Sequence, residues 1–421
     1  MRFVTLLVAV FAAAAAGQDA PQPLPRGPET VTVPLMLDHN RVVINAEITL
    51  PDGSAQRVRA WIDNGNPDLL MSRRVATVLG LNVTCGDQSC SAPPPEQISI
   101  GGMKIGLAAA KQAKIPLKPA DAASVLVPGL SAEINIPSTV LRNYAVLIDL
   151  SGHEFTIGQP GKLQFKGVKS KAIVDSQNGL IEIPSEIEKK KYNLALDLGS
   201  SISVLGETLF DQLAAAHPEW PHMTGAVGPA NMWGTSDELN ARLLRVERLQ
   251  FGPLFLTGVP AMRPSPGAVE VFGKRAGLAG VGVLGTEALM NYRVGIDYAH
   301  SAVYFDIGRL FNFPDFDVIG LILRPEDDGK FTVLGVADYN GKPSISVGPD
   351  GVQPGDHLVA VDGISTAGST LGQVWLMLGG VPGKTRTLTV ERGGKQFSVA
   401  GRVQRFLEER EENKDERQYF R

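Results

Sequence analysis

Two stretches decide how this 421-residue chain folds: RVRAWIDNGNPDLLMS, residues 57–72, and KYNLALDLGSSISVLG, residues 191–206. In each stretch an apolar run leads into an aspartate, Asp63 or Asp197, that stands two residues before a glycine. Glycine permits backbone conformations closed to other residues, so each pattern predicts a strand that ends in a tight turn. The turn would direct the aspartate carboxyl away from the end of the strand.

The two stretches belong to a longer repeat. Residues 132–157 read AEINIPSTVLRNYAVLIDLSGHEFTI, and residues 280–305 read GVGVLGTEALMNYRVGIDYAHSAVYF. Without a gap, similar residues fall in register, for example Tyr144 opposite Tyr292. The chain therefore predicts two copies of one unit, and two facing turns would bring two carboxyls together.

The order of these motifs resembles that of aspartic peptidases of the pepsin and retropepsin type, over about residues 31–308. Val283, Leu284 and Gly285 are similar to the hydrophobic-hydrophobic-Gly signature that packs beside a catalytic turn in that family. The resemblance implies an all-β fold with two acid-protease-like β-barrel lobes. These lobes are expected at residues 32–160 and residues 161–308.

The resemblance implies that Asp63 and Asp197 form a catalytic dyad. Two carboxyls about 3 Å apart cannot both ionise easily, so one keeps a proton while the other is an anion. Together they would activate a water to attack a peptide carbonyl, and the assignment of the two roles stays open because the titration belongs to the pair. Four neighbours would support the two turns: Gly65, Gly199, Ser200 and Gly285.

Three positions depart from the family pattern. The family has Thr or Ser after each aspartate, and its hydroxyl ties the turns together; this chain has Asn64 and Leu198, of which only Asn64 can hydrogen-bond through its side chain. Pro137 stands opposite Gly285 and supplies no backbone N–H. Two functions therefore stay open. The chain is either an aspartic-type endopeptidase acting on extended polypeptides or a catalytically inactive pepsin-like protein that binds peptides.

In the enzyme, substrate would lie extended between the lobes. The hairpin around Ile98 to Ile105, with Gly101 and Gly102 at its tip, is the expected flap of lobe one. The stretch GPANMWGTSDEL, residues 228–239, is a candidate for the facing hairpin of lobe two, with core packing as the alternative role for its Trp.

Residues 318–406 resemble a PDZ domain of the bacterial protease-associated type. The clearest match is GVQPGDHLVAVDGIS, which predicts a turn into a strand at residues 357–361. Residues 371–378 are expected to form the helix on one side of a peptide groove. The resemblance implies that backbone N–H groups near the start of the domain hold a peptide's terminal carboxylate, so that the domain captures peptide ends. The residues concerned are Gly320, Leu321 and Ile322.

The start of the chain predicts export. Arg2 followed by an apolar run to Ala16 is typical of a cleavable secretory signal at residues 1–17, and the run is shorter than the roughly 20 residues of a membrane span. We expect a secreted or periplasmic protein without a membrane span. The remaining segments are a flexible linker or pro-segment at 18–31, a linker at 309–317 and a charged tail at 407–421.

Cys85 and Cys90 predict a disulfide in an oxidising compartment, and a metal site is the weaker alternative because no histidine lies nearby. The formal net charge of -4, without a long basic block, argues against nucleic acid as a partner. We expect no metal and no organic cofactor. The expected partners are polypeptide substrates or C-terminal peptides, and the oligomeric state is left open.

Overall fold

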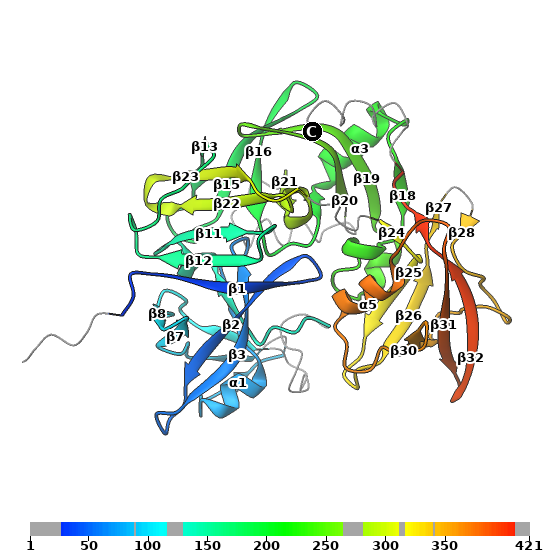
Figure 1. Ribbon diagram of the computed structural model, residues 1–421, viewed down its shortest axis with the longest axis horizontal. Coiled ribbons are helices and arrows are strands. Elements are labelled where there is room, and N and C mark those ends of the chain that lie inside the picture. The colour runs from blue at the N-terminus through cyan, green and yellow to red at the C-terminus, as the bar shows by residue number, and fades with distance from the viewer. Residues whose placement is uncertain are drawn as a thin grey trace, which may run out of the picture.

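The structure is a computed structural model that describes residues 27–87, 90–115, 129–263, 281–310, 316–339 and 342–408. The expected signal peptide, residues 18–26 of the segment that follows it, most of the linker at 309–317 and most of the charged tail lie outside these residues. Figure 1 shows mainly strands and a few short helices. The first lobe (blue to cyan) and the second (mainly green) share a sheet, and a further domain (yellow to red) packs beside the second lobe.

Both lobes are built from short strands with single helices between them. Those of lobe one are β1 (Thr30–Asp38), β2 (Arg41–Thr49), β3 (Ala55–Asp63), β4 (Leu69–Leu70), α1 (Arg73–Val78), β5 (Thr84–Cys85), β6 (Cys90–Ala92), β7 (Gln97–Ile100), β8 (Met103–Gly106), β9 (Ala113–Ile115), β10 (Ile134–Pro137), α2 (Ser138–Leu141), β11 (Ala145–Asp149) and β12 (Glu154–Gly158).

Those of lobe two, with four short 3₁₀ turns labelled η, are β13 (Val168–Lys171), β14 (Ile173–Val174), β15 (Ile181–Ile187), β16 (Lys190–Asp197), β17 (Ser203–Leu205), α3 (Glu207–Ala216), β18 (His222–Thr224), η1 (Gly228–Ala230), η2 (Ser236–Leu239), β19 (Arg242–Phe251), β20 (Leu254–Arg263), β21 (Gly282–Gly285), η3 (Thr286–Leu289), β22 (Tyr292–Asp297), η4 (Tyr298–His300) and β23 (Ala302–Ile307).

The predicted repeat is visible in the strand register. Strand β3 pairs in parallel with β10, and this places Asp63 opposite Pro137. Strand β16 pairs in parallel with β21, and this places Asp197 opposite Gly285. Each aspartate thus ends a buried strand at the same position of its lobe, which confirms the gapless alignment of the two copies. The fold is all-β and double-lobed, of the acid-protease type.

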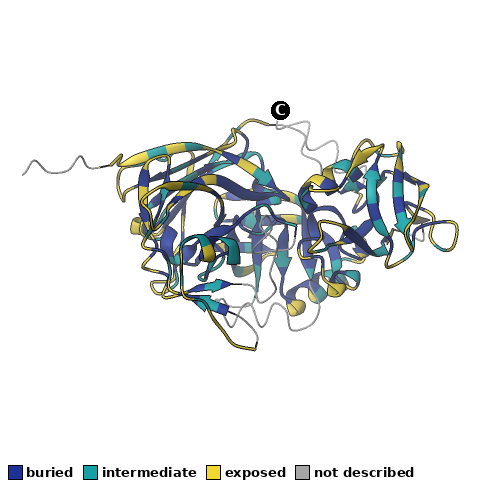
Figure 2. Ribbon diagram, turned by 90° about the horizontal axis from the view of Figure 1, so that it is seen from below, coloured by how far each residue is buried: buried dark blue, intermediate teal, exposed yellow. Residues whose placement is uncertain are grey.

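One sheet joins the lobes. Strand β11 of lobe one pairs antiparallel with β22 of lobe two, with Ala145 opposite Asp297 and Asp149 opposite Arg293. Its neighbours continue outward through β12 and β1 on one side and β23 and β13 on the other. One hydrophobic core contains residues of both lobes, and Figure 2 shows buried residues (dark blue) along the central strands. The shared sheet and core fix the position of one aspartate turn relative to the other.

The residues after the two lobes form a domain with its own core. It contains β24 (Asp317–Val318), β25 (Leu321–Pro325), β26 (Phe331–Val336), β27 (Asp338–Tyr339), β28 (Lys342–Pro343), β29 (His357–Val361), β30 (Ile364–Ser365), α5 (Leu371–Leu378), β31 (Thr385–Arg392), β32 (Lys395–Arg402) and β33 (Gln404–Arg405).

The predicted strand at 357–361 and helix at 371–378 of this C-terminal domain are confirmed. The helix begins at Thr370, whose hydroxyl accepts a hydrogen bond from the backbone N–H of Gln373 while the Gln373 side chain bonds back, which satisfies two N–H groups that a helix start leaves open. Strand β25 stands at the edge of the main sheet. A second core, which includes Trp375, joins the domain to lobe two.

The hairpin around Ile98 to Ile105 forms as predicted, but its expected role as the flap of lobe one is wrong. Strands β7 and β8 do form the hairpin, and Gly101 and Gly102 have the positive φ angles of a tight turn. However, β7 pairs with β2, and a Cβ on Gly101 would lie 3.0 Å from Val33, so the tip packs on β1. The reason is the alternation of apolar residues along the hairpin, which buries one face in the core instead of leaving it free to cover a substrate.

The core of the shared sheet predicts a difference between two Phe→Ala variants. Phe305 on β23 is 2% exposed and packs edge-to-face against Phe251, whereas Phe255 on β20 is 78% exposed. Phe305→Ala should lower the free energy of unfolding by about 3–5 kcal/mol, because it leaves a cavity. Phe255→Ala should change it by less than about 0.5 kcal/mol. Urea unfolding followed by fluorescence measures both, and equal losses would contradict the buried position of Phe305.

Candidate active site

The structure brings Asp63 and Asp197 together across the boundary between the lobes. A Cβ built on Gly65 would lie 2.0 Å from the carboxyl carbon of Asp197, and one built on Gly199 would lie 2.4 Å from Oδ1 of Asp63. No side chain fits in either space, so each turn needs its glycine to admit the carboxyl of the other turn. The two turns therefore interlock through their carboxyls.

Different groups hold the two carboxyls. The backbone N–H of Gly199 donates to Oδ1 of Asp197 at 2.8 Å, and the N–H groups of Ser200 and Gly65 also interact with Asp197. Asp63 instead accepts from Nδ2 of Asn135 at 3.0 Å. Sequence reasoning missed Asn135, although it is aligned with Val283, the first residue of the family signature, and could have been found from the repeat.

Burial governs the protonation of the dyad. Asp63 is 2% exposed and Asp197 is 8% exposed. Burial raises the pKa of Asp63 well above its usual value, and the charge of Asp197 adds to this effect. Burial also raises the pKa of Asp197, to about 6, against the opposing effects of the Gly199 N–H and the charge of Arg41. The pair therefore retains a proton at pH values where an exposed aspartate is fully ionised.

Asn64 compensates for the missing hydroxyls. Its Nδ2 donates to the carbonyl of Leu196 at 2.7 Å, and its Oδ1 accepts from the N–H of Leu198 at 2.8 Å. One amide thus supplies both the donor and the acceptor that tie lobe one to the turn of lobe two. The Leu198 side chain is fully buried in the common core and does not need to hydrogen-bond.

Pro137 does not disturb the turn of lobe one. The N–H of Ser138, one residue later, donates to the carbonyl of Asn66 at 2.9 Å. In lobe two the N–H of Thr286, one residue after Gly285, donates to the carbonyl of Ser200 at 2.9 Å. The equivalent brace therefore comes from the following residue in both lobes, so the N–H that proline lacks is not required for it.

Arg41 is a second residue that the sequence reasoning missed. It is only 2% exposed, and its guanidinium lies 5.6 Å from the ring centre of Trp61 in lobe one and 4.9 Å from that of Trp233 in lobe two. Burial lowers the pKa of Arg41 to about 10, which leaves it charged at neutral pH. An arginine at the start of an apolar strand does not by itself indicate that its guanidinium is buried between two tryptophans of different lobes.

The residues expected to bind a peptide end lie at the start of β25. The N–H of Gly320 donates to the Ser344 hydroxyl at 2.7 Å, and the N–H of Leu321 donates to the carbonyl of Ile319 at 2.8 Å. Leu321 and Ile322 are buried. These N–H groups are therefore engaged within the domain in this structure.

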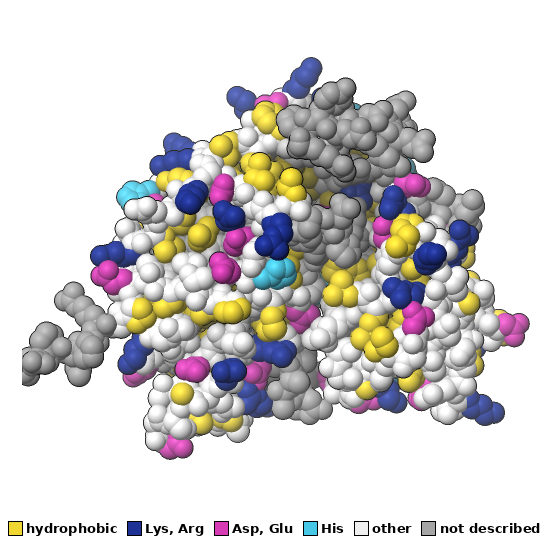
Figure 3. All heavy atoms as spheres, in the orientation of Figure 1, with side chains coloured by type: hydrophobic (Ala, Val, Ile, Leu, Met, Phe, Trp, Pro, Cys, Tyr) yellow, Lys and Arg dark blue, Asp and Glu magenta, His cyan; other side chains and the backbone are white. Residues whose placement is uncertain are grey.

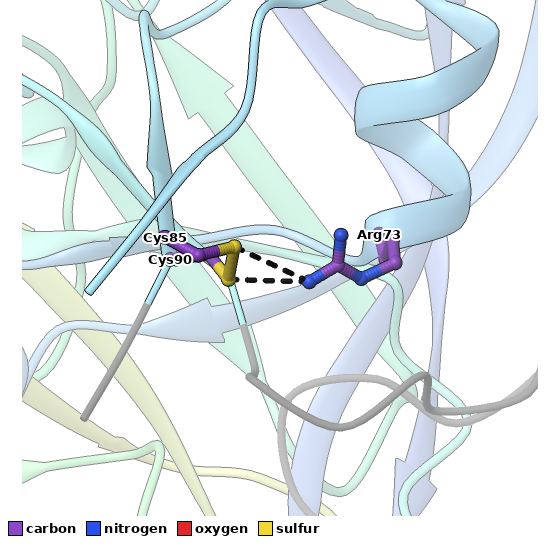
Figure 4. Close-up of a disulfide and its surroundings, with 3 residues drawn as sticks. All are labelled: Arg73, Cys85 and Cys90. Atoms are coloured by element: carbon purple, nitrogen blue, oxygen red, sulfur yellow. Dashed lines mark hydrogen bonds between the residues drawn. A yellow bond between two sulfur atoms is a disulfide. The ribbon is translucent and has the colours of Figure 1, made fainter. Parts of the chain in front are cut away.

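Cys85 and Cys90 are joined by a disulfide between β5 and β6, and Nη2 of Arg73 on α1 lies 3.2 Å from the sulfur of Cys90 (Figure 4). Within the described ranges no three His, Cys, Asp or Glu side chains gather as metal ligands. No helix in the described part of the chain is long and apolar enough to cross a membrane. On the face in Figure 3 acidic and basic side chains are interspersed.

Comparison with known proteins adds a likeness in fold. No family model and no curated protein matches the sequence. Among solved structures, the chain is similar to the aspartic proteinase from Irpex lacteus, with 12% sequence identity and a TM-score of 0.40 over 66% of this chain and 97% of that one.

The cross-lobe bonds of Asn64 predict a stability effect. Asn64→Ala should lower the free energy of unfolding by at least about 2 kcal/mol, because it leaves the buried carbonyl of Leu196 and N–H of Leu198 without partners. The exposed Asn82→Ala is the matched control and should change it by less than about 0.5 kcal/mol. Chemical denaturation at constant pH compares the two. If both variants are as stable as the parent, the amide does not tie the lobes together.

The raised pKa of Asp197 predicts a pH-dependent stability. Its folded-state pKa of about 6 exceeds the usual 3.8, so its contribution to stability is present below pH 3.8 and is lost as the pH rises towards 6. Asp197→Asn stays neutral and escapes this loss. The melting temperature of Asp197→Asn relative to the parent should therefore increase from about pH 4 to about pH 7. Exposed Asp350→Asn should show no such increase, and a flat difference for Asp197→Asn would contradict the buried dyad.

Proposed function

We propose that this protein is an aspartic-type endopeptidase that hydrolyses extended polypeptides with a water activated by Asp63 and Asp197. The observation that supports the proposal best is the interlocking of the turns. An aspartate that only caps its own turn needs no space in a turn of the other lobe. Here the glycine of each turn provides that space for the carboxyl opposite.

The chemistry follows from the proton that the pair retains. The ionised carboxyl removes a proton from a water, whose oxygen forms a bond to the peptide carbonyl carbon. The protonated carboxyl donates to the carbonyl oxygen, which gives a tetrahedral diol. The carboxyl that took up the water proton then donates it to the amide nitrogen as the C–N bond breaks, and one diol hydroxyl returns its proton to the other carboxylate as the C=O bond re-forms. Because the two carboxyls titrate together, neither role is tied to one aspartate.

The departures from the family pattern are compatible with this function. Asn64 makes two bonds between the lobes from a single side chain, and Ser138 and Thr286 brace the turns in equivalent ways. The geometry that the hydroxyls serve in the family is thus reached with an amide.

We propose that the C-terminal domain is a PDZ domain that receives peptide ends. Supporting this, β25 is an edge strand that follows Gly320 and begins with Leu321 and Ile322, and residues of β25 and α5 line one small cavity. We also propose a secreted or periplasmic location, because residues 1–17 have the pattern of a secretory signal and the disulfide is of a kind that persists in oxidising compartments.

A peptide-binding protein without catalytic activity is the second candidate. The observation that favours it is the burial of the dyad, because Asp63 and Asp197 expose little surface to a water or a peptide. Such a protein would keep the lobes and the groove and hold peptides without cleaving them.

Asp→Asn variants distinguish the two functions. Asp63→Asn and Asp197→Asn should each lower kcat/KM for an unstructured polypeptide by about 10²–10⁴-fold, because each removes one half of the acid–base pair. A statine-type transition-state mimic should inhibit the parent, and Asp350→Asn should cleave as the parent does. Cleavage is followed from about pH 3 to about pH 8. No cleavage by folded protein at any pH, with peptide binding retained, would establish the second candidate instead.

A further inference from the structure

The stretch of residues 225–239, here called the lobe-two loop, lies between the dyad and the C-terminal domain. The side chain of Asn231 pairs with the edge of β25: its Nδ2 donates to the carbonyl of Leu323 at 3.0 Å, and its Oδ1 accepts from the N–H of Leu323 at 2.9 Å. The loop also approaches β25 so closely that a Cβ on Gly234 would lie 2.6 Å from Pro325. Between this loop, β25 and α5 a cavity of only about 10 Å³ is left.

Hydrogen bonds link Asn231 to the next two residues of the loop, Met232 and Trp233, which contact Arg41. Glu238 accepts from Nδ2 of Asn231 at 2.8 Å and from the backbone N–H of Trp233 at 2.8 Å, which fixes the turn between them. Met232 then presents its carbonyl to Nη2 of Arg41 at 3.2 Å, and Trp233 presents its ring to the Arg41 guanidinium. The C-terminal domain therefore holds the loop in the position in which the loop contacts Arg41.

The loop also reaches the turn of the dyad directly. The hydroxyl of Ser200, three residues after Asp197, lies 3.8 Å from the sulfur of Met232. On its other side Arg41 faces Trp61, which stands two residues before Asp63 on β3. The guanidinium thus lies between β3, which carries Asp63, and the lobe-two loop, which contacts the turn of Asp197 through Met232.

The groups around Arg41 are mostly acidic. It interacts electrostatically with Asp63 on β3, Asp197 on β16, Asp38 on β1 and Glu238 on η2. His39, in the turn before it, is neutral because burial, with the nearby charge of Arg41, lowers its pKa to about 3. Nε of Arg41 is buried and has no hydrogen-bond partner among the described residues. The donors of the guanidinium are therefore not all satisfied by hydrogen bonds to its neighbours.

We propose that Arg41 is a positioning residue that sets the pH range in which the dyad holds a single proton, and that the C-terminal domain keeps it in place through the lobe-two loop. The proposal rests on the proposed function. Two carboxyls buried without a cation would both stay protonated to higher pH, and a doubly protonated pair has no base to activate water. The buried positive charge of Arg41 favours the loss of the first proton from the doubly protonated dyad.

The pH profile of cleavage tests the role of Arg41. Arg41→Met removes the charge but keeps an unbranched side chain, and it should move the acid limb of the kcat/KM profile upward by about 1 pH unit. Arg41→Lys keeps the charge and should move the limb less. Arg57→Met removes a charge from the exposed side of β3 and should leave the limb unchanged. A folded Arg41→Met enzyme with the parent's profile would overturn the proposal.

A readout without turnover separates this proposal from the proposed function. Carbon-13 NMR of labelled aspartate carboxyl groups, assigned with Asp63→Asn and Asp197→Asn, follows the titration of the dyad whether or not the protein cleaves peptides. The dyad should titrate at higher pH in Arg41→Met than in the parent. If the parent does not cleave but this shift is seen, the proposed function fails and the effect of Arg41 on the dyad stands. An unchanged titration would overturn the effect itself.

Asn231→Ala tests whether the C-terminal domain holds Arg41 in place through the lobe-two loop. This variant remains informative if Arg41→Met does not fold. It removes both bonds to Leu323 while leaving Arg41 in the chain. The acid limb, or the carboxyl titration, should move in the same direction as in Arg41→Met but by a smaller amount. Exposed Asn82→Ala is the matched control. A folded Asn231→Ala protein with an unchanged titration would show that the C-terminal domain does not hold Arg41 through this loop.

Discussion

The structure depends on the close approach of two carboxyl-bearing turns at the buried boundary between the lobes. Burying two acidic groups beside each other is unfavourable unless their charge is reduced or balanced. The chain meets this demand with glycines that make room, with N–H donors around Asp197, with the amide of Asn135 on Asp63 and with a retained proton. The pairing of β11 with β22 and the common core hold the turns in this arrangement.

The third domain is part of the same arrangement and not only an addition to it. Its Trp375 joins a core shared with lobe two and meets the ring of His39 from lobe one edge-to-face, with 5.5 Å between the ring centres. Thr370 at the start of α5 donates to Asp38 at 2.7 Å. The domain therefore contacts both lobes, and its edge strand is covered by the lobe-two loop through Asn231. A peptide that extends β25 would have to displace this loop.

The parts of the site that follow from local sequence could be predicted. The strand, turn and glycine around Asp63 and Asp197 are encoded within a few residues, and the repeat places them in equivalent positions. The expected flap was wrong because a hairpin signal does not say which surface the hairpin packs on. Arg41 was missed because its role arises from contacts with residues far away in the chain. Asn135 stands in the repeat, but its bond to Asp63 depends on the pairing of β10 with β3.

By itself the sequence determined that the chain has two related β lobes, an aspartate at the end of a strand in each, and a further domain with a strand at 357–361 and a helix at 371–378. These features depend on periodicity, glycine and short-range spacing. Only the tertiary structure decided that Asn64 ties the lobes together, that Arg41 is buried and interacts with the dyad, and that a loop of lobe two bonds to the edge of β25. The physical reason is that hydrogen bonds and charge interactions between residues far apart in the chain depend on distances that no local pattern specifies.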